Sequence, residues 1–471
     1  MDCKASHAQI ESLKRTLQQA FDVMLERLVV LLTCAEPTLE ALERALLAEL
    51  HVLGNVTLNG LCATLAPRYP PAQAPCGCGG AMRYVRQRQA QCKTLLGVMQ
   101  LKRPYYLCDD CHTGACPLDR TLGLCAGGIS AGLEALLALM GTEFSYSHAA
   151  ALVEQLSLVS ISAGRCRQAT IALGECLADH EQQVRTTVWE QGQEPPATTA
   201  APSGEPALDP LYVSADGVIV PTRETGWREQ CVGAVYTTTP LSHRRPARPS
   251  AQSEHAPGAQ ASLRSQSLSY ISELGARPAF AQSLWLEAHR RGLEQAKTVV
   301  FVGDGAPWLW QSAEELFPAA IQILDWYHAS SYVRRTAQAL YPADEALRSQ
   351  WAEAQLTALW QSRTSAVIAR LEALAADCTA AREALGYFTT NQTRMDYVRY
   401  RSLDLQVGSG AIESACKHVI QVRIKQAGMR WCVRNVRTMG KLRARLKSGR
   451  WEETLALRPP RHRSYHRQNA T

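Results

Sequence analysis

The sequence has no continuous apolar run of the ~20 residues that a helix needs to cross a bilayer. Its start, Met1-Asp2-Cys3-Lys4, lacks the basic-then-apolar order of a secretory signal. The 16 cysteines are spread over 471 residues, which is too sparse for a scaffold held together by disulfides. We therefore expect a cytoplasmic protein with reduced thiols that is neither inserted in a membrane nor exported.

Acidic residues are scarce near the C-terminal end. The whole chain carries a modest net charge of +7, which does not by itself indicate a partner. Residues 414–471 hold 15 Lys and Arg against two acids, a net charge of +13 that leaves −6 for the first 413 residues. A solvated helix face rarely has so few acids, so the pattern favours a surface that binds phosphate groups. The residues assigned to that surface are Arg423, Lys425, Arg430, Trp431, Arg434, Arg437 and Lys441.

Apolar residues make up 46% of the chain, enough for a sizeable core, and the length suggests two to four domains at roughly 100–200 residues each. Apolar spacing and proline-rich stretches divide the chain into eight segments. The segments are an N-terminal helical region (1–70), a module of Gly-rich knuckles and short strands (71–125), a second helical region (126–190), a Pro-rich linker (191–210), the first part of an α/β core (211–340), a helical insertion (341–400), a last core helix with the basic segment (401–455) and a disordered basic tail (456–471). Within the core, the proline-containing stretch 240–262 predicts a mobile loop.

The second helical region contains a pattern similar to a helix-turn-helix. Residues 147–155 and the helix from Ala163 onward are separated by a short turn. Arg165 and Arg167 in the second helix are candidate DNA contacts. Two helices that merely pack together explain the same pattern equally well, so both interpretations stay open.

Three carboxylates stand beside glycines where an α/β sheet gathers functional groups. Asp216 closes the strand predicted at 211–215, Asp304 closes the strand at 298–302, and Glu413 opens a helix after a glycine turn. Ligand-binding groups collect at the carboxyl ends of such strands, although an Asp-Gly pair is also an ordinary turn. Three converging carboxylates would repel one another without cations, which favours a site for Mg²⁺ or Mn²⁺. Two such ions roughly 3.5–4 Å apart would activate water at a phosphodiester.

Residues 211–451 resemble a DDE transposase of the Mutator-like kind, and most nearly the ISKra-type family of bacterial insertion-sequence transposases. The matching stretches are SADG from Ser214, GDGAPW from Gly303, DWYH from Asp325 and VGSGAIESACKHVIQVRIKQAGMRW from Val407. The resemblance implies a ribonuclease H-like α/β core with a helical insertion before the glutamate.

The resemblance also implies roles for five residues. Asp216, Asp304 and Glu413 would form the metal-binding catalytic triad. Asp325 and His328 would support it, with His328 orienting a phosphate or a carboxylate near the active site. A helix cap with a nearby histidine is the alternative interpretation of that pair.

Four cysteines in the 71–125 module have the pattern of a zinc ribbon, a tetrahedral structural site of thiolates. Two of them have the Cys-x-x-Cys spacing, whereas the first pair is separated by one residue where relatives have two. Cys116 or His112 is an alternative ligand, and buried or idle thiols are the alternative to zinc. The four predicted ligands are Cys76, Cys78, Cys108 and Cys111.

Together these features predict an insertion-sequence transposase that binds terminal inverted repeats, cleaves DNA and joins it to a target. A non-catalytic DNA-binding regulator and a structure-selective nuclease are the alternatives. The expected partner is double-stranded DNA, from both the element ends and the target, in the nucleoid of a bacterial cytoplasm. Because two DNA ends must be paired, we expect a homodimer or a larger synaptic complex, with the helices from Ile10 to Leu53 as one candidate interface.

Overall fold

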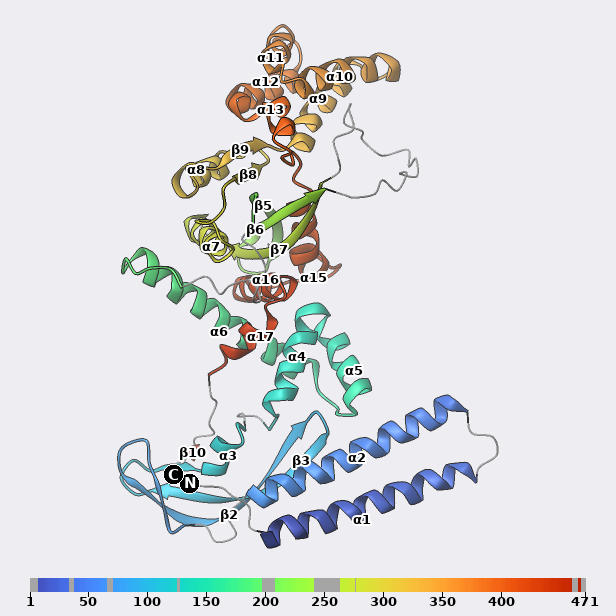
Figure 1. Ribbon diagram of the computed structural model, residues 1–471, viewed down its shortest axis with the longest axis vertical. Helices are drawn as coiled ribbons and strands as arrows, with labels where there is room; N and C mark the ends of the chain where they lie inside the picture. Colours follow the sequence, from blue (N-terminus) through green and yellow to red (C-terminus); the bar gives the residue numbers. More distant parts are fainter. Residues whose placement is uncertain are drawn as a thin grey trace. The chain divides into compact units, whose positions relative to one another are not determined.

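The structure is a computed structural model that describes residues 7–33, 38–65, 71–124, 128–196, 208–240, 263–275, 277–459 and 465–466. It is a mixed α/β protein, with helices and two five-stranded sheets in the described part of the chain (Figure 1). Two compact units can be distinguished: unit 1 comprises residues 1–173 and 455–471, and unit 2 comprises residues 174–454. Most of the predicted linker, mobile loop and C-terminal tail lies outside the described residues.

The division between the units falls inside a helix, α6 (Ala163–Trp189), ahead of the predicted linker at 191–210. The second half of α6 belongs to unit 2 because its side chains bond to that unit. Glu175 pairs with Arg434, and Glu181 pairs with Lys441.

Unit 1 begins with a helical hairpin formed by α1 (His7–Leu32) and α2 (Leu39–Leu65), which confirms the two predicted helices. The Gln9 amide donates to the Thr64 carbonyl, and Arg27 pairs with Glu49, so the two helices run antiparallel. Helix α2 is long and apolar enough to cross a membrane, judged by length and composition alone. Such a helix was not expected from the sequence. Alone, a helix of this kind is weak support for a membrane protein.

The sheet of unit 1 has the strand order β1-β2-β3-β4-β10, and all neighbours are antiparallel. Its two long strands extend well beyond the short ones expected from the sequence. A small apolar core, with Cys62 of α2 and Met99 and Leu101 of β3, joins the hairpin to the sheet. The bounds are β1 (Gln73–Pro75), β2 (Ala81–Thr94), β3 (Gly97–Cys108), β4 (Thr113–Ala115) and β10 (Tyr465–His466).

Short helices complete unit 1, and they include the predicted helix pair with its intervening turn. Leu133, Leu137, Val153 and Cys166 form their shared core. Their packing is explained by this core alone, so a DNA-reading role stays a prediction. The bounds are α3 (Pro117–Thr121), α4 (Ala131–Glu143) and α5 (Tyr146–Ser157), followed by α6.

Unit 2 is built on a sheet with the strand order β7-β6-β5-β8-β9. Strands β7, β6 and β5 are antiparallel, whereas β5, β8 and β9 run parallel. The central strands are apolar and buried, as strands covered on both faces require. The bounds are β5 (Leu211–Thr222), β6 (Gly226–Pro240), β7 (Leu263–Leu274), β8 (Val299–Gly303) and β9 (Ile321–Leu324).

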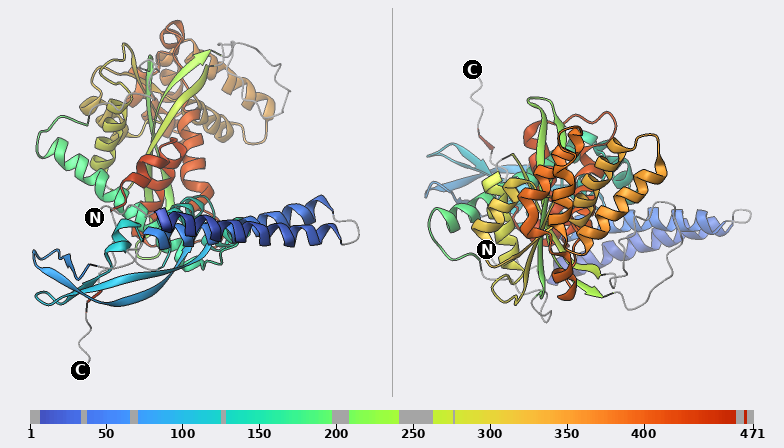
Figure 2. Two further views of the ribbon diagram at one scale, coloured as in Figure 1. Left: turned by 60° about the horizontal axis from the view of Figure 1, so that its bottom comes forward. Right: turned by 90° about the horizontal axis from the view of Figure 1, so that it is seen from above.

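Helices flank this sheet and fill the region between β9 and the last core helices, where a helical insertion was expected (Figures 1 and 2). Before the insertion come α7 (Arg277–Arg290), α8 (Pro307–Leu316) and α9 (Trp326–Leu340). The insertion holds α10 (Glu345–Trp360), α11 (Thr364–Glu372), α12 (Thr379–Asn391), a 3₁₀ turn (Gln392–Arg394) and α13 (Tyr397–Ser402). The last elements are α14 (Gly410–Ala415), a π-helical turn (Cys416–Gln421), α15 (Val422–Ile424), α16 (Val433–Lys447) and α17 (Trp451–Ala456).

Candidate metal centres

Asp216 and Asp304 stand on neighbouring parallel strands of unit 2. The pairing of β5 with β8 ends at Ser214 and Val302, two residues before each aspartate. Asp304 directly follows β8, as predicted. Asp216, in contrast, lies within β5, which continues to Thr222 because it stays paired with β6. The expectation that Asp216 closes a strand is therefore wrong, although it does lie where the parallel pairing ends.

Asp216 is a partly buried carboxylate with an adjacent negative charge. Its Oδ1 accepts a hydrogen bond from the Gly217 amide at 2.6 Å, and its Oδ2 accepts one from the Cys416 thiol at 3.5 Å. Burial raises the pKa of Asp216, and repulsion from Asp304 raises it further. Burial and repulsion both make the ionised form of Asp216 less stable, and a bound cation would stabilise that form.

Asp304 is held by a tight turn that the helical insertion supports. Its Oδ1 accepts a hydrogen bond from the Ala306 amide at 2.9 Å, and its carbonyl accepts one from the Tyr387 hydroxyl at 2.7 Å. Gly305 has a φ of +100°, and a Cβ at this position would lie 2.5 Å from the Tyr387 ring. Only glycine meets both requirements, so the turn that presents Asp304 depends on Gly305 and on α12.

Asp325 and His328 form a fixed pair at the start of α9. The Asp325 carboxylate is fully buried and caps the helix through the amides of Tyr327 and His328. It also accepts hydrogen bonds from the His328 Nδ1 at 2.7 Å and from the amide and hydroxyl of Ser409. The hydrogen bond to Asp325 raises the pKa of His328 against the effect of burial. Because the Asp325 carboxylate can only accept, Nδ1 carries a proton, and Nε2 is the ring nitrogen that Asp325 does not engage.

Glu413 is exposed on α14, which contacts β5 and β6. Its carboxylate lies 3.4 Å from the Ser409 hydroxyl, whose single proton is also within reach of Asp325 at 2.9 Å, so Ser409 lies between the two acids. Ligand atoms of Asp325, His328 and Glu413 lie within 4.8 Å of one another. In the described part of the chain, Asp216 and Asp304 lie outside this tight group, though both charges act on His328.

A π-helical turn (Cys416–Gln421) directly follows α14, the helix that carries Glu413. Such turns disturb the regular hydrogen-bond ladder and often occur at functional sites. The buried Arg443 of α16 binds the turn: its Nε donates to the Val419 carbonyl at 2.6 Å, and its guanidinium also contacts the His418 carbonyl. The turn starts at Cys416, whose thiol reaches Asp216, so Arg443 supports the register between the Glu413 helix and β5.

The four predicted zinc ligands of unit 1 converge. Their sulfur atoms lie within 4.8 Å of one another, with Cys76 and Cys111 at 3.5 Å and Cys78 and Cys108 at 3.7 Å. The one-residue knuckle closes because Gly79 adopts a φ of +93° and Cys76 pairs with Gly80. Hydrogen bonds from Thr113 lower the pKa of Cys111 to about 6, which favours a thiolate. Neither Cys116 nor His112 belongs to the cysteine group in the described residues.

Three of the residues assigned to the phosphate-binding surface are buried, and this corrects the prediction. The Arg423 guanidinium lies over the Trp431 ring at 4.9 Å, and the Trp431 indole donates to the Ile424 carbonyl. Lys441 is 2% exposed and pairs with Glu181 at 2.9 Å and with Glu273. A buried cation needs such partners. Arg423, Trp431 and Lys441 are therefore part of the interior of unit 2 and are not exposed on its surface.

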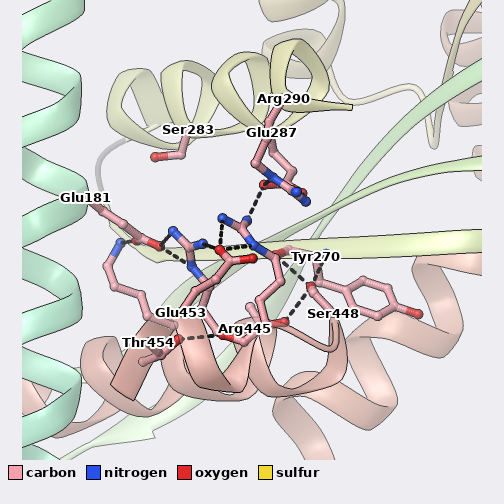
Figure 3. A network of polar contacts seen from close by, with 12 residues as sticks. Glu181, Tyr270, Ser283, Glu287, Arg290, Arg445, Ser448, Glu453 and Thr454 are labelled. Carbon is pink, nitrogen blue, oxygen red and sulfur yellow. Dashed lines mark hydrogen bonds and ion pairs between the residues drawn. The ribbon is translucent and has the colours of Figure 1, made fainter. Parts of the chain in front are cut away.

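The ion pairs around Glu181 connect α6 with β7 and the C-terminal helices. Glu181 accepts two hydrogen bonds from Arg445 (Figure 3). Arg450 pairs with Glu287 of α7 at 2.9 Å. Burial by itself would raise the pKa of Glu181, but the charges of Lys441 and Arg445 outweigh it and lower the pKa to about 2. Acids distant in the sequence thus neutralise much of the basic segment.

The remaining predicted DNA contacts differ in exposure. In unit 2, Lys425 and Arg430 are exposed, whereas Arg434 pairs with Glu175 and Arg437 with Glu273. In unit 1, Arg167 is exposed, and Arg165 is partly buried and donates to Gln168.

Sequence reasoning missed four residues that support the site: Cys416, Ser409, Tyr387 and Arg443. Two of them had a signal, because Cys416 and Ser409 lie three and four residues from Glu413 and so share its helical face. Tyr387 and Arg443 had none, because their partners are backbone carbonyls of distant segments.

No protein-family model and no curated protein sequence matches the chain. The function is therefore inferred from the geometry of the site and the motifs of the sequence.

Proposed function

We propose that the protein is an insertion-sequence transposase that binds the inverted-repeat ends of its element, cleaves DNA and transfers the cleaved strand to a target. The observation that carries this proposal is the placement of Asp216 and Asp304 on adjacent parallel strands, with the Glu413 helix packed on one of those strands. A sheet of three antiparallel strands continued by two parallel ones supports the ribonuclease H-like core that the resemblance implies.

The carboxylates fit divalent cations by their chemistry. Oxygen donors suit Mg²⁺ or Mn²⁺. Burial, together with repulsion from Asp304, raises the pKa of Asp216, and a bound cation would stabilise the ionised carboxylate. Asp216, Asp304 and Glu413 would hold the ions, which would activate a hydroxyl or water and stabilise the leaving oxygen at phosphorus. His328, fixed through Nδ1 by Asp325, would present Nε2 to a phosphate oxygen.

We also propose that Cys76, Cys78, Cys108 and Cys111 bind one structural Zn²⁺. Tetrahedral zinc with Zn–S bonds of ~2.3 Å requires sulfur atoms separated by ~3.8 Å. The separations of 3.5 and 3.7 Å support this fit. Zinc would stabilise the sheet of unit 1, because the ion would tie the turn that follows β1 to the end of β3.

The proposed partner is double-stranded DNA in the bacterial nucleoid. Lys425 and Arg430, which follow the Glu413 helix and are exposed, are the proposed phosphate contacts of unit 2. Arg167 is the corresponding candidate in unit 1. The pairing of two DNA ends calls for at least a dimer.

The test is an assay of end cleavage and strand transfer with purified protein, Mg²⁺ or Mn²⁺, and DNA that carries the inverted repeats flanking the gene. We expect Asp216→Asn, Asp304→Asn and Glu413→Gln each to lower cleavage by more than about 100-fold, since each removes a metal ligand. The control is Glu315→Gln, an exposed acid on α8.

The outcomes separate the three candidate functions. Cleavage without joining in the wild type would identify a nuclease, and end binding without cleavage would identify a regulator. Full activity in all three carboxylate variants would refute the catalytic assignment.

A further inference from the structure

The α1–α2 hairpin of unit 1 presents large apolar side chains that the described part of the chain leaves exposed. Leu13, Leu17 and Met24 point inward and fill the seam between the helices. A second set lies beside the seam and is between 42% and 73% exposed. This set comprises Phe21, Leu25 and Leu32 of α1 and Leu39, Leu46 and Leu50 of α2.

Helical geometry places the six exposed residues on one face of the hairpin. At ~100° per residue, the three residues of each helix fall within about 40° of one another. On both helices this stripe is rotated from the inward seam in the same sense by roughly 80°. Because the helices are antiparallel, equal rotations bring the two stripes to the same side. These residues therefore form one largely apolar face, which also contains Lys14 of α1 and Glu43 of α2 at the same helical angles and is here named the hairpin face.

We propose that the hairpin face pairs with the hairpin face of a second copy of this chain, forming a four-helix bundle. With Ile10 and Leu61, which are also exposed, each stripe extends over about 23 residues or ~34 Å. Two helices of ~10 Å diameter make a face of roughly 700 Å², so that a dimer buries about 1,400 Å² in total. That area lies within the range of stable, specific interfaces.

The charges of the hairpin favour an antiparallel arrangement of the two copies. The hairpin can be divided into two halves along its length. The half made of residues 7–20 and 53–65 carries a net charge of +1, whereas the half made of residues 21–33 and 38–52 carries −3. An antiparallel pair sets the basic half of one copy against the acidic half of the other, and a parallel pair sets acid against acid. With the two-fold axis at the middle of the stripe, near Phe21, Arg15 of one copy faces Glu26 of the partner.

A lipid bilayer is the competing occupant of this face, because α2 is apolar and long enough to span one. The pattern of charges argues for a second copy. Glu40, Glu43 and Glu49 lie within α2, and Asp22 and Glu26 lie beside the stripe of α1. Burial of such carboxylates in hydrocarbon would be costly. In a four-helix bundle Asp22, Glu26 and Glu40 lie at the rim, and Glu43 lies in the paired face together with the oppositely charged Lys14.

The experiment is light scattering after size exclusion on the full-length chain at roughly 1–50 μM, the range in which a micromolar dimer dissociates. We expect a mass twice the 51.7 kDa of one chain for the wild type and a single-chain mass for Leu25→Glu combined with Leu46→Glu. Both positions are exposed, so far-ultraviolet circular dichroism should not change. The matched control is Leu156→Glu on α5, at a leucine that is 60% exposed outside the hairpin.

A charge exchange tests the antiparallel arrangement. Arg15→Glu should weaken the dimer at low salt, and the addition of Glu26→Arg should restore it. A wild-type monomer at the highest concentration, an unchanged dimer in the Leu25 and Leu46 variant, or flotation of a monomeric wild type with phosphatidylcholine vesicles would overturn the proposal. Because mass is measured without DNA or metal, failure here is distinguishable from failure of the transposase proposal.

Discussion

The partly buried acid Glu181 provides a quantitative test of how unit 2 is held together. Its side chain is 20% exposed and pairs with Lys441 and with Arg445; Figure 3 shows the Arg445 contact. The pKa of about 2, against an ordinary value of 4.5, means that the folded state favours the ionised form. A difference of 2.5 units at 1.36 kcal/mol each corresponds to about 3 kcal/mol of stability at pH 7. We therefore expect Glu181→Gln to lower the free energy of unfolding of unit 2 by that amount.

The sign of the pH dependence follows from the lowered pKa. The contribution of Glu181 is complete above pH 4.5 and is lost as the pH falls towards 2, because the unfolded state then binds the proton first. The difference between wild type and Glu181→Gln should shrink from about 3 kcal/mol at pH 7 to about 1.4 kcal/mol at pH 3.

Urea unfolding followed by tryptophan fluorescence measures this difference in unit 2 alone, since all ten tryptophans lie between residues 189 and 451. Glu175→Gln on the same helix is the control. Its partner Arg434 is 72% exposed, so this substitution should cost less than about 1 kcal/mol. A loss below about 0.5 kcal/mol for Glu181→Gln, or a loss that does not decline with pH, would refute the reasoning.

Three further outcomes are expected. Cys78→Ser should reduce the zinc content measured by mass spectrometry from one ion per chain to a small fraction, and equal zinc in both proteins would exclude this cysteine as a ligand. Cys416→Ala should move the half-maximal pH of cleavage upward, because the Asp216 carboxylate loses a hydrogen-bond donor that lowers its pKa. Cys416→Ser should keep the wild-type profile, and an unchanged profile in the alanine variant would show that the thiol has no influence. Lys425→Ala and Arg430→Ala should each lower the slope of log affinity for DNA against log salt by about 0.9, and unchanged slopes in filter binding would show that neither residue contacts phosphate.

Local patterns in the sequence were sufficient to predict the elements whose apolar residues recur at a regular spacing or form a continuous run. The hairpin helices follow from apolar residues at helical spacing, and β8 follows from the unbroken run Val299 to Val302. Strand β7 was not predicted because its sequence, LRSQSLSYISEL, is largely polar. It pairs with β6 along its backbone, and that kind of stabilisation leaves little trace in composition.

The candidate site was predictable to the extent that its residues lie next to glycine turns. Asp304 and Glu413 stand where the turns indicated. The position of Asp216 inside β5 was not predictable, because the continuation of this strand depends on pairing with β6 on one side after β8 has ended on the other. The second layer of contacts, from Tyr387 and Arg443, depends on tertiary packing that no local pattern encodes.

The basic segment shows why charge along a sequence differs from charge in space. A run with 15 cations and two acids predicts a phosphate-binding surface only if the acids of the remaining chain stay away from it. In unit 2 they do not, because Glu181 on α6 and Glu273 on β7 meet Lys441 on one side of α16. The neutralised cations hold α6, the sheet and α16 together, while Lys417, Lys425 and Arg430 remain exposed and follow Glu413 by 4, 12 and 17 residues. The positive surface available to the proposed DNA partner is therefore narrower than the sequence indicates, and it includes these cations close in sequence to the glutamate that is proposed to bind metal.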